Sequence, residues 1–299
     1  MEQFMKKIIL IILTINQFLV AKDAIQIYNC YGNAQYIIID GRVLDTRDFK
    51  TSLTEDGVFT NLQENLGHLF NNEKENQSLT LSIDIHKYPI KSDDEGYFHF
   101  EATTTPYNYF KHQQRIKLSV DKSNISATCN LTIIKANQQV GIISDFDDTV
   151  IVSDVPHKLN LINNVFLKNY KQRTLITKMP KEFKTILGNN SNALFFVTGS
   201  PKQLQNNIHK FLDYHHFPKR TLITKKIHGN NSDPLFDQIA YKYAKIQKLI
   251  LLYPHINWVL FGDSGEKDKE VYSKVKKNFP TKVKAIYIRN VESGKIEKL

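Results

Sequence analysis

The apolar stretch near the start of the chain lacks the length of a membrane span. About 20 consecutive apolar residues are needed to cross a bilayer, whereas the run at residues 8–13 is interrupted by polar residues from Thr14 onward. Two lysines precede this run, and the stretch closes on the small residue Ala21, the order typical of a secretory signal peptide. We therefore expect residues 1–21 to be a signal peptide and the protein to be exported, periplasmic or secreted. An uncut amino-terminal anchor is the alternative.

Cysteine is scarce, with only two residues in a chain of 299. The first, Cys30, lies too far behind the apolar run for the cysteine-linked anchor of a lipoprotein. Export would allow Cys30 to pair with Cys129 in a disulfide bond, but two separate buried thiols are equally compatible with the sequence.

Acidic residues are outnumbered, with 30 Asp and Glu against 40 Lys and Arg, a net charge of +10. Loss of residues 1–21, which hold two lysines and one glutamate, would leave +9. A basic surplus suits an anionic partner such as a phosphoester, an anionic membrane surface or nucleic acid. The interleaved aromatic and basic residues of a nucleic-acid stacking platform are missing, so we expect no nucleic acid partner.

Internal repeats are also missing, and the sequence pattern changes once, near residue 138. Residues 22–137 contain short alternating stretches, such as 79–85 and 115–120, separated by turn residues, which predicts a small β-sandwich accessory domain. A helix is expected within residues 55–76. The length of the chain suits two domains of this size.

Residues 138–299 contain apolar runs separated by longer helical or loop stretches. This pattern predicts an α/β catalytic domain with a parallel sheet covered on both faces. Ligands of such sheets bind outside the carboxyl ends of the strands. The expected strands are residues 140–143, 193–197, 220–223, 258–261 and 284–288.

The first of these strands runs into the sequence SDFDDTV, with Asp145 and Asp147 two residues apart. Beyond a strand end the backbone turns, so both carboxylates can converge on one phosphorus, where one attacks and the other moves a proton beside a bound cation. An aspartate-rich corner is the structural alternative. A calcium-binding EF-hand loop is excluded because Val150 and Pro156 occupy its glycine and glutamate positions.

Polar groups follow two further strands and open a helix. Thr198 offers a hydroxyl for a phosphoryl oxygen, and Lys245 offers a counter-charge from the start of an amphipathic helix. Asp263 and Asp268 offer carboxylates for a hard cation. Taken singly, these features also suit a helix cap, a surface lysine and an acidic loop, but their order favours a phosphoryl-transfer site.

This order resembles the haloacid-dehalogenase superfamily of phosphotransferases. The sequence is similar to the actin-patch-type phosphatidate phosphatase family of fungi and bacteria, a relative of the lipin catalytic domain. The likeness is carried by the segments ISDFDDTV, FFVTGSPKQL, FGDSGEKDKEVY and VKAIYIRNV. The likeness covers residues 140–290 and departs at Thr198, where the family usually has Ser, and at Ala244, where His usually precedes the lysine.

The resemblance implies a Rossmann-like fold and a hydrolase that releases diacylglycerol and phosphate from phosphatidate. Asp145 would be the nucleophile that forms an aspartyl-phosphate, Asp147 the general acid and base, and Thr198 with Lys245 the neutralising groups. Mg²⁺ would be held by the Asp145 carboxylate, the Asp147 carbonyl and Asp263, with Asp268 or Asp148 supporting these ligands.

Only about 43 residues separate Thr149 from Ala193, which is too few for a large cap domain. We therefore expect an open site, suited to a headgroup at an anionic membrane surface. The apolar residues within 159–171 could rest on such a surface or pack on the core. The alternatives to a lipid phosphatase are the same chemistry on a soluble phosphoester and a catalytically silent lipid-binding module.

Overall fold

The computed structural model describes residues 22–46, 74–104, 110–152, 168–188, 191–227, 232–234 and 237–299. The expected signal peptide at residues 1–21 lies outside these ranges, as do nearly all of the expected helix at 55–76 and most of segment 159–171. Within the described ranges, no helix combines the length and apolarity that crossing a bilayer requires.

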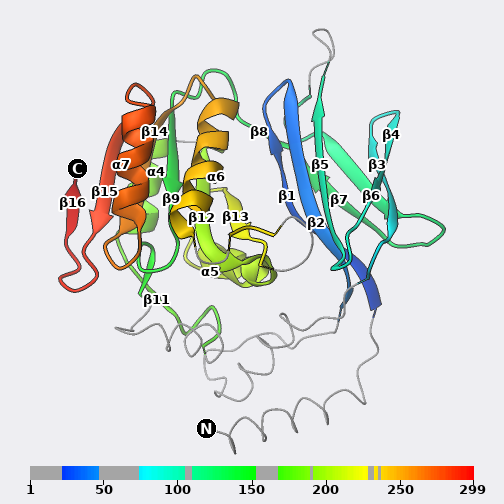
Figure 1. Ribbon diagram of the computed structural model, residues 1–299, viewed down its shortest axis with the longest axis horizontal. Helices are drawn as coiled ribbons and strands as arrows, with labels where there is room; N and C mark the ends of the chain where they lie inside the picture. Colours follow the sequence, from blue (N-terminus) through cyan, green and yellow to red (C-terminus); the bar gives the residue numbers. More distant parts are fainter. Residues whose placement is uncertain are drawn as a thin grey trace, which may run out of the picture.

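The amino-terminal part of the chain forms two four-stranded sheets (Figure 1). The first sheet, in the order β5-β2-β1-β8, contains β1 (Lys22–Gly32), β2 (Tyr36–Thr46), β5 (Tyr97–Thr103) and β8 (Thr132–Ile133). The second sheet, in the order β4-β3-β6-β7, contains β3 (Ser78–Ile83), β4 (His86–Lys91), β6 (Arg115–Val120) and β7 (Ser126–Asn130). We call residues 22–134 of these sheets and their connections the amino-terminal unit.

Alternation along the strands builds the core of this unit. Successive side chains of a strand point to opposite faces, and every second residue of β3 and β6 is buried, from Leu79 to Ile83 and from Ile116 to Val120. These residues share one apolar cluster with Ile37 and other residues of the first sheet.

A disulfide bond between Cys30 and Cys129 ties β1 of the first sheet to β7 of the second, with Cα atoms 6.4 Å apart. This separation is ordinary for a disulfide. Of the two alternatives that the sequence left open for these cysteines, the paired one is confirmed.

The described residues from Val140 onward contain a six-stranded sheet in the order β13-β12-β9-β14-β15-β16. Its strands are β9 (Val140–Ser144), β12 (Leu194–Pro201), β13 (Thr221–Lys225), β14 (Asn257–Asp263), β15 (Val283–Arg289) and β16 (Ile296–Lys298). All neighbouring pairs are parallel except β15 with β16. The five expected strands and the mixed α/β class are confirmed, and the antiparallel edge strand β16 of this sheet was not predicted.

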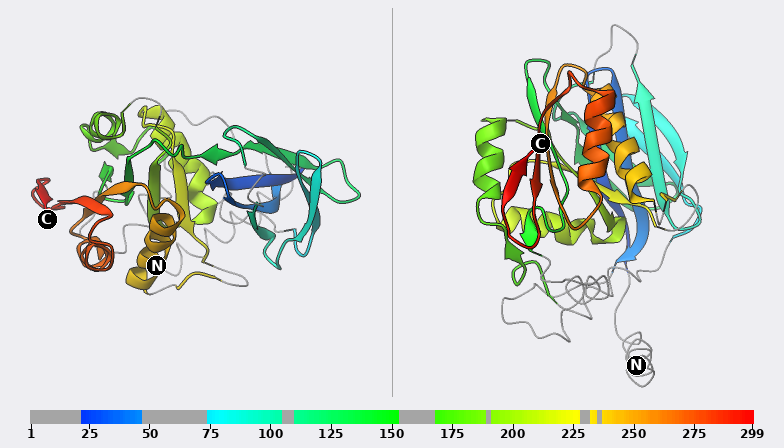
Figure 2. Two further views of the ribbon diagram at one scale, coloured as in Figure 1. Left: turned by 90° about the horizontal axis from the view of Figure 1, so that it is seen from above. Right: turned by 60° about the vertical axis from the view of Figure 1, so that its left-hand side comes forward.

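Helices cover both faces of this sheet (Figure 2). The helices α6 (Gln238–Leu252) and α7 (Asp268–Asn278) lie on one face, and α4 (Met179–Leu187) and α5 (Gln205–Tyr214) lie on the other. A short 3₁₀ helix, η1 (Lys202–Leu204), precedes α5, and β10 (Ile151–Val152) pairs with β11 (Thr174–Leu175) in a small antiparallel two-stranded sheet.

Strand β9 is central and almost wholly buried, and its neighbours are β12 and β14. Ser144 at its end is level with Phe196 of β12 and Phe261 of β14. The residues that follow Ser144 therefore emerge between the carboxyl ends of two parallel strands, where open α/β sheets bind ligands.

Candidate active site

Asp145 is the first residue beyond β9, and its carboxylate is buried at the carboxyl edge of the sheet. Its N–H donates to the carbonyl of Phe261 at 2.9 Å, which continues the pairing with β14 and fixes the backbone there. The residue is 1% exposed, and neither carboxylate oxygen accepts a hydrogen bond from the described part of the chain. Burial raises the pKa of Asp145 well above its ordinary value, although the ammonium of Lys242 opposes this.

Lys242 is the cation of the site. Its Nζ lies 3.0 Å from Oδ1 of Asp145, 2.9 Å from Oε2 of Glu266 and 2.6 Å from Oδ1 of Asp268. The Lys242 side chain is 1% exposed. Burial disfavours its charge, but the three carboxylates outweigh burial and raise the pKa of Lys242 well above its usual range. A permanent ammonium beside Asp145 is therefore built into the core.

The sequence had assigned this position to Lys245, and the geometry corrects that assignment. Lys245 instead pairs with Oδ1 of Asp233 at 2.7 Å, and its side chain is one-third exposed. The reason is the start of helix α6, which was expected near residue 243 but begins at Gln238, where the side chain of Asp237 accepts from the N–H of Ala240 at 2.8 Å. The helix runs away from the carboxyl edge, so the lysine one turn earlier reaches Asp145.

Asp147 lies beside the hydroxyls that follow β12. Its Oδ2 accepts from Oγ of Ser200 at 2.9 Å and from Oγ1 of Thr198 at 3.4 Å. Oγ1 of Thr198 in turn accepts from the N–H of Ser200 at 3.0 Å, which ties the Thr198 hydroxyl to the backbone of Ser200. Ser200 lies within the motif recognised in the sequence, but no role was predicted for it. In the structure its hydroxyl is closer to Asp147 than the hydroxyl of Thr198 is.

Burial raises the pKa of Asp147, and the nearby Glu266 adds to this effect, while Arg173, the Ser200 hydroxyl and Lys242 oppose it. A carboxyl group that holds its proton more firmly than usual can donate that proton to a leaving oxygen.

A turn brings Asp147 back over the strand ends. Asp148 has a φ of 53°, in the left-handed region, and the N–H of Thr149 donates to the carbonyl of Asp147 at 2.7 Å. Arg289 of β15 donates to the carbonyl of Asp148 at 2.9 Å and holds the turn against the sheet. Lys242 and Glu266 both act on the pKa of Asp145 and on that of Asp147, which is consistent with this turn keeping the two aspartates in one region of the sheet edge.

The acidic loop after β14 is organised by Asp263. Its Oδ1 accepts from the N–H groups of Gly265 at 2.6 Å and Glu266 at 2.9 Å. Its own N–H donates to Oδ2 of Asp268 at 3.2 Å. Gly262 is required beside them because a Cβ there would lie 2.6 Å from Asp268. Burial, with repulsion from Asp268 and Glu266, raises the pKa of Asp263 to about 7.

Two groups of carboxylates could hold a cation. Oxygens of Asp145, Glu266 and Asp268 all lie within 4.8 Å of one another, but these three also surround the ammonium of Lys242, which offsets part of their charge. The stronger observation is that Oδ2 of Asp145 and Oδ2 of Asp263 are buried without a hydrogen bond in the described residues, whereas Oδ1 of Asp145 faces the Lys242 ammonium at 3.0 Å. Such orphaned oxygens at adjoining strand ends suit a hard cation. Glu266 had no role in the sequence prediction.

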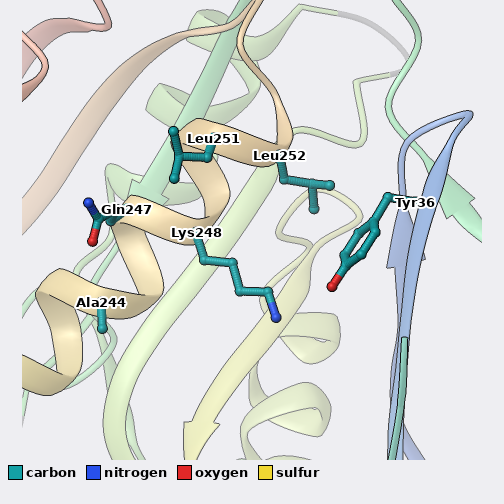
Figure 3. Close-up of a pocket in the computed structure, with 6 residues that line it drawn as sticks. All are labelled: Tyr36, Ala244, Gln247, Lys248, Leu251 and Leu252. Atoms are coloured by element: carbon teal, nitrogen blue, oxygen red, sulfur yellow. The ribbon is translucent and has the colours of Figure 1, made fainter. Parts of the chain in front are cut away.

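A groove of about 330 Å³ lies elsewhere, between β2 and the carboxyl end of α6 (Figure 3). It is lined by Tyr36, Ala244, Gln247, Lys248, Leu251 and Leu252. The lining residues Ala244, Lys248 and Leu251 are on the exposed side of α6, whereas Lys242 is on its buried side. The groove is therefore separate from the carboxylate cluster, and the chemistry described above does not use it.

Comparison with known proteins agrees with this geometry. Residues 140–290, about half of the chain, match the family model described as Phosphatidate phosphatase APP1, catalytic domain. These residues include every strand of the six-stranded sheet except β16 and every side chain of the site described above.

Two yeast proteins are similar in sequence. Phosphatidate phosphatase APP1 of Saccharomyces cerevisiae is 30% identical over 152 residues, which are 50% of this chain and 26% of the yeast protein. An uncharacterized protein of Schizosaccharomyces pombe is 25% identical over 219 residues, 70% of this chain and 35% of that protein. The matched parts thus span about a quarter to a third of these relatives.

Among solved structures, a carbohydrate acetylesterase from Xanthomonas citri aligns over 91% of this chain and 68% of its own. Its identity is 9% and its TM-score is 0.27, so this likeness carries no argument. The family match rests on the half of the chain that builds the carboxylate site. The chain therefore belongs to the family of the phosphatidate phosphatase APP1 catalytic domain.

Proposed function

We propose that this protein is an exported, Mg²⁺-dependent phosphatidate phosphatase that releases diacylglycerol and phosphate through an aspartyl-phosphate. The observation that carries the proposal is the different environment of the two aspartates that follow β9. Asp145 lies 3.0 Å from a buried lysine ammonium, and Asp147, two residues on, is held by two hydroxyls. The family match and the phosphatidate phosphatase of Saccharomyces cerevisiae that this chain resembles support phosphatidate as the substrate.

In the first step, an oxygen of the Asp145 carboxylate attacks phosphorus, and the bond between phosphorus and the ester oxygen breaks. The carboxyl group of Asp147 gives its proton to that oxygen, which leaves as the hydroxyl of diacylglycerol. Lys242 stabilises the charge that gathers on the phosphoryl oxygens, since electrostatic stabilisation carries most of the catalysis in phosphoryl transfer. The hydroxyls of Thr198 and Ser200 keep Asp147 directed at the leaving oxygen.

In the second step, water attacks phosphorus of the aspartyl-phosphate and breaks its bond to the Asp145 oxygen. Asp147, now ionised, accepts the proton of the water, so both carboxyl groups return to their starting forms. Phosphate is the second product.

The Asp145 carboxylate, the Asp147 carbonyl and Asp263, supported by Asp268, are the groups that would hold Mg²⁺. The orphaned oxygens of Asp145 and Asp263 support this ligand set, because oxygen-only ligation suits a hard divalent cation. When bound, the ion would supply positive charge to the phosphoryl oxygens and keep Asp145 ionised.

The remaining assignments are part of the same proposal. Residues 138–299 form the Rossmann-like catalytic domain of the haloacid-dehalogenase type, without a large cap. Residues 22–137 form the β-sandwich accessory domain, and residues 1–21 direct export. The disulfide between Cys30 and Cys129 supports export, because disulfides persist in oxidising compartments.

The test is phosphate release by the exported protein from phosphatidate in anionic vesicles, lysophosphatidate, a sugar phosphate and a nucleotide, with and without Mg²⁺. We expect the highest kcat/KM for phosphatidate. A higher kcat/KM on a soluble ester would assign the same chemistry to another substrate. Binding of phosphatidate vesicles without phosphate release would identify a silent lipid-binding module and refute the enzyme.

A further inference from the structure

Two ion pairs join the amino-terminal unit to the carboxyl edge of the six-stranded sheet. Lys202, directly after β12, lies 2.6 Å from Oδ1 of Asp40 on β2. Lys226, directly after β13, lies 2.5 Å from Oδ2 of Asp93, which precedes β5. The side chains of both pairs are at most 15% exposed. The two pairs are thus alike in chemistry and burial but attach to different strands.

The pair at Asp40 is supported on both sides. Nδ2 of Asn29 on β1 donates to Oδ2 of Asp40 at 3.2 Å, so a residue of the same sheet also holds the carboxylate that pairs with Lys202. The ammonium of Lys202 also lies 5.5 Å from the ring centre of Tyr28, within the range of a cation–π contact. Asp40 and Tyr28 of the amino-terminal unit therefore both position the Lys202 ammonium.

A second contact fixes the same segment three residues later. Nε2 of Gln205, which is 1% exposed, donates to the carbonyl of Tyr28 at 2.7 Å. Its Oε1 accepts from Oγ1 of Thr224 on β13 at 2.8 Å. The 3₁₀ helix at Lys202–Leu204 is thus held to β1 and β2 at its beginning and directly after its end.

This segment begins two residues beyond Ser200, whose hydroxyl donates to Asp147 at 2.9 Å. Only Pro201 separates Ser200 from Lys202. Because proline fixes one of the two backbone torsions at this position, the placement of Lys202 is transmitted to Ser200 with little freedom. Lys226 belongs to the neighbouring strand end and has no such link along the chain.

We infer that Asp40 of the amino-terminal unit is a positioning residue for the proposed phosphatase site, acting through Lys202 to hold the Ser200 hydroxyl against Asp147. The inference rests on the proposed function for its catalytic consequence. On this inference the amino-terminal unit contributes to the active site, because the Asp40 carboxylate on β2 fixes the position of Ser200 after β12.

The test compares Asp40→Asn with Asp93→Asn in the full chain. Both variants lose one buried inter-unit ion pair, so general loosening of the interface affects both. We expect Asp40→Asn alone to lower kcat by about tenfold, as expected for a group that orients catalytic machinery, with KM within about twofold of wild type. Lys202→Gln should reproduce this loss, and combining it with Asp40→Asn should add little.

The leaving group distinguishes positioning from plain destabilisation. If Asp147 is misplaced, protonation of the leaving oxygen suffers, so an alkyl phosphate should lose more activity than p-nitrophenyl phosphate, whose leaving group needs little protonation. Equal losses on both substrates, or equal losses in Asp40→Asn and Asp93→Asn, would overturn the inference.

Hydrogen exchange gives a readout that does not need activity. We expect faster amide exchange across residues 198–205 in Asp40→Asn and Lys202→Gln than in Asp93→Asn. Unchanged exchange there would refute the positioning role whatever the substrate. If the wild-type protein hydrolyses no phosphate ester but the variants still differ in amide exchange in this way, the proposed function is refuted and the structural link between Asp40 and residues 198–205 remains.

Discussion

Nζ of Lys242 lies 3.0 Å from Oδ1 of Asp145, and each side chain is 1% exposed. A buried ammonium beside the attacking carboxylate can offset part of the negative charge of an arriving phosphoryl group. Lys242 and Lys245, three residues apart on one helix, therefore have different partners, because Lys245 pairs with Asp233.

Replacing Lys242 by Met should therefore lower kcat/KM by about a hundred- to a thousandfold, the usual loss for one preorganised electrostatic contact. Lys245→Met is the matched control, with an expected loss of less than about threefold because its pair is partly exposed. Steady-state kinetics on phosphatidate vesicles, with circular dichroism of both variants, decides between them. A larger loss from Lys245→Met would return the catalytic role to that residue.

Asp145→Asn should abolish turnover without weakening the fold. The amide has nearly the volume of the carboxylate but cannot attack phosphorus. Because burial raises the pKa of Asp145, an ionised carboxylate is costly there, and a neutral amide should leave the melting temperature of the metal-free protein unchanged or higher. Residual activity above about a hundredth of wild type would remove Asp145 from the role of nucleophile.

Removal of divalent cations by a chelator should abolish phosphate release, and added Mg²⁺ should restore it. Asp263→Asn should raise the Mg²⁺ concentration for half-maximal activity by about tenfold or more, because an uncharged amide oxygen is a weaker ligand for a hard cation. Lys245→Met serves again as the control, with an unchanged Mg²⁺ requirement. Full activity after exhaustive metal removal would contradict the proposed cofactor.

Reduction of the bond between Cys30 and Cys129 should destabilise the amino-terminal unit. The two cysteines are 99 residues apart, and in the chain-entropy model a loop of this length corresponds to about 4–5 kcal/mol of unfolding free energy. Urea unfolding of the oxidised protein and of a Cys30→Ser, Cys129→Ser variant measures the difference. Identical midpoints would mean that the apolar core alone holds the two sheets together.

The half-buried His209 should make stability depend on pH below neutrality. Burial and the Arg220 guanidinium, whose Nη2 donates to the His209 carbonyl at 2.9 Å, lower the pKa of His209 to about 4 from 6.5. The unfolded chain therefore binds a proton at this position at a higher pH than the folded one. Between about pH 6.5 and pH 4, the unfolding free energy should fall by about 2 kcal/mol on this account.

His209→Gln should flatten that part of the pH profile in urea unfolding. His86→Gln, at an exposed position of β4, controls for the loss of a histidine without this environment. A profile of His209→Gln that is as steep as that of wild type would assign the dependence to other groups.

The sequence alone was enough to predict the five parallel strands of the main sheet and the family. Continuous apolar runs specify buried parallel strands because both faces of such a sheet are covered, and the polar residues that follow each run must then meet at one edge. Asp145, Asp147, Thr198 and Asp263 could be named for this reason. The acidic loop after β14 was also recognised as a motif, but Glu266 within it carries a contact that no spacing rule had singled out.

Only the tertiary structure decided which lysine enters the site, that Ser200 holds Asp147, and that Asp40 reaches Lys202 across two sheets. The choice between Lys242 and Lys245 depended on where helix α6 begins, and helix ends are set by a single capping contact that periodicity does not reveal. Contacts between residues 162 positions apart depend on how two separately patterned units dock. Local sequence determines the elements and their order, whereas distances of a few ångströms between side chains arise only when those elements pack.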